Sequence, residues 1–402
     1  MLQAATFETT DTPIAATPSR FRWMRDAFTT PSTRFVGIDF SIPTVRIATL
    51  DQAKPQQRHS DGLGPLHCTS CCRIELPFNP LENTTPELID RMVDRLGESL
   101  PRCVDGEENV AVLSMPSPWI HYETIPVAPA SDAAAQLPVE IRQRCDQMFR
   151  ASAFRSSAHL SHWPVASGAP LHVLAATATD TACKIAEHVS DIGYHVQSIL
   201  PHGVALGLAA GPLTSLQPRC LVLLQRLSGL VCVTQSGRCG LSRVLPNCPR
   251  QVFYAEDVDS LHPWIEQVAK EIQATLKFAA RNQSDVDPDA VVMLCGDLAH
   301  IEGIDVAFAN FLQRPVAKWM FTGEATRGCF IQSDSNVDDP RNAVAFSLAF
   351  AASRSVACKQ GGRTKREMKA MPQADDKASL DTGQQSGRET NPVPGQDAGV
   401  TR

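Results

Sequence analysis

Apolar and polar residues between positions 34 and 50 are arranged as two strands joined by a tight turn. The runs FVGIDF and TVRIATL have strand periodicity, and the segment SIPT separates them. RIELPF, residues 73–78, predicts a third strand and so an antiparallel meander. Asp39 ends the first apolar run, so we expect its carboxylate at the sheet edge where the chain turns.

The residues that follow have the pattern of an α/β layer. Residues 52–72 are polar and contain Gly and Pro, which predicts a loop before the third strand. Residues 84–100 place apolar side chains at helical spacing behind Thr85 as N-cap and Pro86 in the first turn, which predicts a helix. NVAVLSMP, residues 109–116, reads as the buried strand that follows a crossover helix.

A second unit is predicted from residue 117 to residue 200. Residues 121–127 and 171–177 have the composition of strands, whereas 135–149 and 180–193 have helical periodicity. The second of these helices ends at a glycine, as helices commonly do. This order predicts a small α+β module.

The strand and turn pattern of the first segment returns between residues 219 and 246. Tight turns are predicted at Ser228 and Gly229 and again at residues 236–237. A long amphipathic helix, an apolar strand and two further helical segments follow, at residues 264–282, 290–299, 304–313 and 342–354. The order strand, turn, strand, strand, helix, strand therefore occurs twice, which predicts a duplicated fold.

Composition narrows the class of protein. The chain has 402 residues, of which 43% are hydrophobic, enough for several units with sizeable cores. A net charge of -6 argues against a globally basic nucleic-acid binder. Residues 1–33 and 355–402 are polar, and we predict a disordered leader and a disordered tail. The tail holds a basic run that suits solvent or an anionic membrane surface, formed by Arg363, Lys365, Arg366 and Lys369.

The same composition predicts a cytoplasmic protein. Thirteen cysteines are scattered without the spacing of a disulfide scaffold, which favours free thiols in a reducing compartment. The N-terminal residues have neither the basic nor the apolar region of a secretion signal. The apolar segments are shorter than the roughly 18 to 20 residues that span a bilayer. We therefore predict no membrane span.

Four stretches together resemble the actin-like ATPase superfamily, and most closely its PilM type, which is similar to FtsA. They are residues 36–50, 138–165, 171–206 and 291–316, which resemble a phosphate-turn hairpin, two parts of an inserted subdomain and the glycine turn of the second half. The resemblance implies an α/β, actin-like (ribonuclease H-like) fold of two duplicated lobes with an inserted α+β subdomain. The implied divisions are 34–116 for subdomain 1A of the first lobe, 117–200 for the insertion and 201–354 for the second lobe, with a return segment to the first.

In such a fold, ATP lies between two hairpin turns whose backbone N–H groups bind its phosphates, and carboxylates position magnesium. The resemblance assigns Asp39 to magnesium, Thr44 to a hydroxyl contact and Arg46 to the charge usually supplied by lysine. The remaining positions that it assigns to the site are Ser41, Ser228, Gly229, Gly296 and Asp297.

The sequence departs from this pattern at each turn. Ser41 stands where a glycine is expected, and Pro43 removes a backbone donor. In the second hairpin, Leu223 replaces the expected aspartate and Gln225 the expected glycine. Asp297 and Leu298 replace small residues beside Gly296, and a carboxylate near a phosphate is repulsive unless it faces metal or solvent. We therefore predict a degenerate nucleotide site.

The function that the resemblance implies is a cytoplasmic scaffold of type IV pilus assembly or of the related type II secretion machinery. Such a scaffold docks the short N-terminus of a PilN-like bitopic inner-membrane protein and is peripheral to that membrane through this partner. No cofactor is expected. ATP with magnesium, in a nucleotide-gated ATPase of the same machinery, remains the alternative. A sugar kinase ranks last, since no substrate loop or catalytic carboxylate is recognisable, and self-association is left open.

The remaining cysteine and histidine residues of note are interpreted as structural residues or free thiols. His67, Cys68, Cys71 and Cys72 have half the spacing of a zinc site, but a second half is missing, so we predict a loop with free thiols. The cysteines of the second hairpin region, which include Cys232 and Cys239, are read as buried small residues, as is Cys248; His188 and His195 are read as structural.

Overall fold

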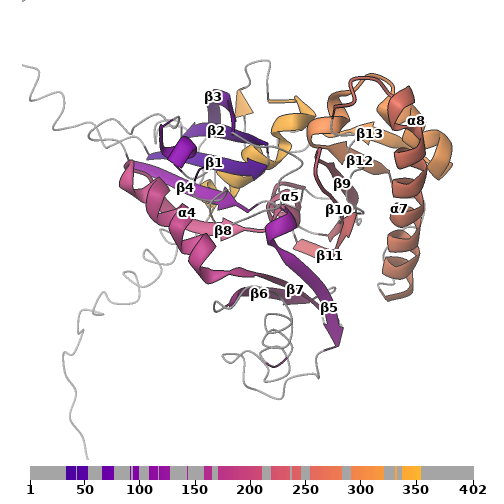
Figure 1. Cartoon of the computed structure of the whole chain (residues 1–402), viewed down its shortest axis with the longest axis horizontal. Helices are drawn as coiled ribbons and strands as arrows, with labels where there is room; N and C mark the ends of the chain where they lie inside the picture. The colour runs from indigo at the N-terminus through magenta and orange to yellow at the C-terminus, as the bar shows by residue number, and fades with distance from the viewer. Residues whose placement is uncertain are drawn as a thin grey trace, which may run out of the picture. The chain divides into compact units, whose positions relative to one another are not determined.

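Three β-sheets and the helices that pack on them make up the described part of the computed structural model (Figure 1). The structure describes residues 33–41, 43–52, 66–76, 91, 94–98, 108–115, 117–126, 143, 158–164, 171–210, 219–235, 238–245, 254–282, 291–320, 331–332 and 337–354. The predicted leader, the tail beyond residue 354, and most of the helices predicted at 84–100 and 135–149 lie outside these residues.

The first sheet has the strand order β14-β3-β2-β1-β4-β8. Its strands are β1 (Thr33–Ser41), β2 (Thr44–Gln52), β3 (Leu66–Glu75), β4 (Glu108–Ser114), β8 (His195–Leu200) and β14 (Ile331–Gln332). The first three form the predicted antiparallel meander, and β4 pairs in parallel with β1. The hairpin predicted from residues 34–50 is confirmed.

The prediction of a loop over residues 52–72 is wrong in its C-terminal part. Residues 66–72 belong to β3, which pairs with β2 along its whole length and has a bulge opposite Thr49 and Leu50. Cysteine, serine and threonine follow one another here without a clear apolar alternation, because β3 is only half buried. The strand conformation of residues 66–72 therefore depends on hydrogen bonding to β2 and not on the local composition.

The second sheet repeats the first. Its order is β11-β10-β9-β12-β13, in which β9, β10 and β11 form an antiparallel meander and β12 pairs in parallel with β9. The strands are β9 (Arg219–Leu224), β10 (Gly229–Gln235), β11 (Arg238–Leu245), β12 (Val292–Cys295) and β13 (Val316–Lys318). The helices α7 (His262–Asn282) and α8 (Ile304–Leu312) pack on one face of it. The predicted duplication is confirmed.

A third, smaller sheet has the order β5-β7-β6. It consists of β5 (His121–Pro126), β6 (Ala158–Pro164) and β7 (Leu171–Ala178), and β7 leads directly into α4 (Thr179–Asp191). Ile185 and Val189 of α4 pack against the face of the first sheet that carries Val36 and Ile38. The chain then returns to the first sheet through β8.

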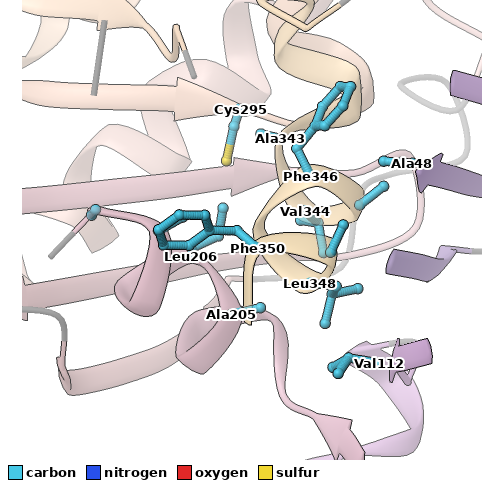
Figure 2. Close-up of a cluster of buried hydrophobic side chains, with 14 of the residues drawn as sticks. Ala48, Val112, Ala205, Leu206, Cys295, Ala343, Val344, Phe346, Leu348 and Phe350 are labelled. Atoms are coloured by element: carbon cyan, nitrogen blue, oxygen red, sulfur yellow. The ribbon is translucent and has the colours of Figure 1, made fainter. Parts of the chain in front are cut away.

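Two helices share one core between the two large sheets. The helix α5 (His202–Ala210) and the helix at residues 343–354 lie among inward-facing side chains of both sheets, as Figure 2 shows for Ala48, Val112 and Cys295. Strand side chains alternate between the two faces of a sheet, so each large sheet has one face in this shared core. The other face of the first sheet is covered by α4, and the other face of the second sheet is covered by α7 and α8.

Close packing against β1 depends on a missing side chain. A Cβ added to Gly37 would collide with the carbonyl oxygen of Ala345 and lie 2.5 Å from the amide nitrogen of Ala349. These are backbone atoms of the helix at residues 343–354, so no rotamer change relieves the collision.

We expect Gly37→Ala to lower the free energy of unfolding by about 3 kcal/mol, because the added methyl group forces the helix away from β1. Urea unfolding followed by circular dichroism measures this. Ser70→Ala, on an exposed position of β3, is the control and should change the stability by no more than about 0.5 kcal/mol. Equal stabilities of the two variants would contradict the prediction.

Candidate functional site

Asp39 is bonded to protein side chains at the end of β1. Its Oδ1 accepts a hydrogen bond from the Ser114 hydroxyl at 2.9 Å and lies 3.0 Å from Nε2 of His202. The same Ser114 oxygen accepts the amide hydrogen of Phe40 at 3.1 Å. Asp39 is only 2% exposed and His202 is fully buried.

His202 is held from its other side as well. It is the first residue of α5, and its Nδ1 lies 3.0 Å from the hydroxyl oxygen of Ser117. Ser117 begins the short 3-10 helix η2 (Ser117–Trp119), directly after β4. Three segments of the first lobe therefore fix the imidazole ring beside the carboxylate.

The carboxylate stays ionised in this buried place. Burial alone would raise the pKa of Asp39, but the hydrogen bond from His202 and the charge of that residue lower it more, with smaller contributions from Ser41 and Arg46. The pKa of Asp39 therefore lies below the usual value of 3.8.

A second contact joins the two hairpin turns. Nε2 of Gln225, at the end of β9, donates a hydrogen bond to the hydroxyl oxygen of Ser41, at the end of β1. Both side chains are almost completely buried. The two positions where the resemblance implies glycine are thus occupied by side chains that bind each other.

An ion pair makes a second contact between the lobes. Nη2 of Arg46, on β2, lies 2.6 Å from Oδ1 of Asp297, and the two side chains are only 5% and 6% exposed. Asp297 begins the 3-10 helix η4 (Asp297–His300), which follows β12 after Gly296. The Asp297 carboxylate, which would repel a phosphate at this place, faces a guanidinium group.

Glycines of the site serve the packing of the backbone. Gly296 has a φ of 96°, and a Cβ on it would lie 2.7 Å from the carbonyl oxygen of Leu224. Its amide donates to the carbonyl oxygen of Pro340 at 2.9 Å. A Cβ on Gly229 would lie 2.6 Å from Cδ1 of Leu245. Both positions need glycine for close contact within the second lobe.

The other assigned positions are also engaged. The Thr44 hydroxyl donates to Oε2 of Glu75 at 3.4 Å, and the carbonyl oxygen of Ser228 accepts the amide hydrogen of Gln225 at 3.0 Å. Leu223, where the resemblance implies an aspartate, is a buried member of the shared core.

A polar cavity of about 280 Å³ lies beside the Arg46–Asp297 pair. It is lined by Pro43, Thr44, Arg46, Arg73, Glu75, Arg226, Tyr254, Glu256, Asp297, His300 and Arg341. Four guanidinium groups and three carboxylates thus surround it. Asp39, Ser41, Ser228 and Gly229 are not among these lining residues.

The sequence did not indicate His202, Ser114 or Ser117 as part of the site. His202 is 163 residues from its partner Asp39, so no local pattern joins them. One signal was present: His202 is the first residue of a helix that is otherwise made of Gly, Val, Ala and Leu. An isolated polar residue in such a segment needs a buried partner.

The cysteine groups have the character of inert thiols. Cys71 lies on β3, and burial together with its neighbours Cys68 and Cys72 raises its pKa to about 12. Cys232 and Cys239 are buried, and Sγ of Cys239 lies 2.9 Å from the Ser242 hydroxyl oxygen. Within the described ranges, no group of three or more His, Cys, Asp or Glu residues is placed to hold a metal ion. Cys248 lies outside the described residues.

We expect Asp39→Asn to lower the free energy of unfolding by roughly 1.5 to 3 kcal/mol at neutral pH, because it removes the charged acceptor of the buried hydrogen bonds from Ser114 and His202. The folded-state pKa of Asp39 lies below 3.8, so its stabilising contribution is complete above that pH and is lost as the pH falls through the folded-state value. Urea unfolding between neutral pH and pH 3 should therefore show a flatter acid dependence for the variant.

Asp51→Asn is the matched control for this prediction. Asp51 pairs with Arg34 at 3.0 Å, but the two side chains are 27% and 32% exposed, so the loss should stay below about 1 kcal/mol. If both variants lost the same stability and kept the wild-type acid dependence, Asp39 would not be the buried, ionised group described above.

Comparison with known proteins gives a likeness in structure only. No protein-family model and no curated protein sequence matches the chain. Among solved structures, a chain of the PilM–PilN type IV pilus biogenesis complex is similar, with a TM-score of 0.56 and 13% identity over 79% of this chain and 98% of that one.

Two other solved structures are more distant. The ethanolamine utilization protein EutJ from Carboxydothermus hydrogenoformans has a TM-score of 0.41 and 11% identity over 80% of this chain and 90% of its own. The cytoplasmic domain of EpsL, an inner-membrane component of the Vibrio cholerae type II secretion system, has a TM-score of 0.36 and 10% identity over 80% of this chain and 95% of its own. The likeness to the PilM–PilN complex confirms the predicted fold: the chain has the duplicated actin-like architecture of the PilM type.

Proposed function

We propose that this protein is an adaptor of type IV pilus assembly, or of the related type II secretion machinery, that works without a nucleotide. The observation that carries the proposal is the Arg46–Asp297 ion pair, which occupies the place between the lobes where the resemblance implies phosphates. The fold shared with a chain of the PilM–PilN complex supports the choice of machinery.

The residues of the site do not fit ATP with magnesium. Asp39, which would position the metal, is bonded to His202 and Ser114. Leu223 lies in the shared core and has no metal ligand to offer, and the amide of Gly296 is bonded to a backbone carbonyl. The groups that would bind phosphate and metal therefore have other partners.

We propose that a short apolar segment of a PilN-like partner docks in the first lobe. A small apolar pocket of about 30 Å³ lies where the three-stranded sheet meets the first large sheet. It is lined by Met115, Ile120, Ala175, Ala176, Thr177, Ala182, Ile199, Leu200 and Pro201. A pocket of this size suits one apolar side chain of an extended peptide, which fixes its register.

The proposed location follows from the partner. A scaffold that holds the cytoplasmic end of a bitopic protein is cytoplasmic and peripheral to the inner membrane. In the part of the chain that the structure describes, no helix is both long and apolar enough to cross a bilayer. In this proposal, the partner supplies the membrane contact.

The adaptor proposal predicts no heat of binding when the full-length protein is titrated with millimolar ATP and magnesium in a calorimeter. A nucleotide-gated ATPase, the alternative, would bind in the micromolar range and lose that binding on Asp39→Ala. Such a result would overturn the proposal.

We expect Ile199→Asp to weaken the binding of the partner's N-terminal peptide at least roughly tenfold, because a carboxylate in an apolar pocket loses its hydration. The partner to test is a PilN-like bitopic membrane protein, and fluorescence anisotropy of its labelled N-terminal peptide measures the affinity. Val306→Asp, on an exposed position of α8, is the control and should bind as the wild type does. Unchanged binding by a folded Ile199→Asp variant would place the docking site elsewhere.

A further inference from the structure

Two buried side-chain pairs join the lobes at the candidate site. Arg46 of the first lobe binds Asp297 of the second, and Ser41 of the first binds Gln225 of the second. All four side chains are at least nine-tenths buried. The lobes are thus joined by polar contacts at the very place where an actin-like protein is joined by its ligand.

We propose that this chain supplies its own substitute for a bound magnesium nucleotide. The Asp297 carboxylate takes the place of a phosphate at Arg46, and His202 takes the place of the metal at Asp39. The cleft is thereby a latent anion site, closed by an internal ligand. This inference concerns the cleft alone and does not depend on the pilus assignment.

The chemistry of the Arg46–Asp297 contact supports the substitution. A guanidinium group binds carboxylate and phosphate oxygens with the same planar geometry, so one replaces the other without rearrangement of the arginine. Only Oδ1 of Asp297 is bonded to Arg46. Oδ2 is buried, and no hydrogen-bond partner for it is found among the described residues. The contact with Arg46 therefore positions the Asp297 carboxylate, and the nearby charge of Arg341 adds to the attraction.

The contact at Asp39 completes the substitution. A carboxylate in this position would hold magnesium through water or directly. Here Nε2 of His202 lies 3.0 Å from Oδ1, in a site with no exposed surface on the histidine. A histidine of α5 therefore occupies, by a hydrogen bond, the carboxylate oxygen that would otherwise face a metal.

The charges that line the cavity beside the ion pair determine its affinity for an anion. Its lining carries four arginines against three carboxylates, so its attraction for an anion is weak. Removal of the Asp297 carboxylate leaves two carboxylates in the lining, and one of the four arginines, Arg341, is paired with Asp339 beside it. It also removes the carboxylate that is in direct contact with the buried Arg46, which is costly unless an anion enters.

Inorganic pyrophosphate is the probe, and the Asp297→Ala variant of the full-length chain is the test. Calorimetry should detect pyrophosphate binding by the variant at least roughly tenfold tighter than by the wild type. The affinity should be the same with magnesium and with EDTA, because Asp39 remains bonded to His202. Pyrophosphate should also raise the melting temperature of the variant and leave that of the wild type unchanged.

Glu271→Ala is the matched control. Glu271 of α7 pairs with Arg243 of β11 at 2.8 Å, but within one lobe and on the surface, where the side chains are 31% and 49% exposed. The substitution frees an arginine in the same way without a cavity or burial. Pyrophosphate should therefore bind no better to this variant than to the wild type.

Asp297→Asn is a second variant, to be used if the Asp297→Ala protein does not fold. The amide keeps the shape and a hydrogen-bond acceptor for Arg46 but removes the charge, so this variant should also gain pyrophosphate binding. A folded Asp297 variant that binds pyrophosphate no better than the wild type overturns the proposal. Equal gains in Asp297→Ala and Glu271→Ala overturn it as well, and a gain that requires magnesium overturns the part assigned to His202.

Discussion

The contact between the backbone of β1 at Gly37 and the helix at residues 343–354 is the constraint on which the other features depend. Because no side chain separates them, this helix lies directly on the first sheet, and its other residues share one core with α5 and the second sheet. A common core of this kind fixes one sheet against the other. The turns after β1 and β9 can then meet at hydrogen-bond distance, as Ser41 and Gln225 do.

Buried charge is tolerated at the site because each group has a partner in place. A buried ion pair contributes little net stability when its desolvation is counted, whereas the loss of one partner is costly. The Arg46–Asp297 contact therefore acts chiefly to define one arrangement of the lobes, and the His202–Asp39 contact fixes α5 against β1. The hydrophobic core supplies the stability, and the polar pairs make alternative arrangements unfavourable.

The sequence predicted most of the fold because its apolar residues have clear strand and helix periods. Residues 66–72 were missed, since a half-buried strand of Cys, Ser and Thr looks like a loop until its partner β2 is known. Within the site, the sequence indicated Arg46 as a cation that could bind a phosphate and Asp297 as a carboxylate that would repel one. Their mutual contact depends on how the lobes meet, and the pairing of Asp39 with His202 spans 163 residues. Neither relation has a local signature.

A two-lobed protein that opens and closes around a ligand needs a cleft that is costly to leave empty. When polar side chains of the two lobes bind each other, the closed cleft is stable without a ligand. A ligand then has no difference in affinity between the open and closed conformations with which to shift their populations. The replacement of small residues by Ser41, Gln225 and Asp297 supplies such side chains at three turns of the chain. Under the proposed function, the same substitutions that would remove a nucleotide switch would keep the lobes in one arrangement, so that the surface offered to a partner is always formed.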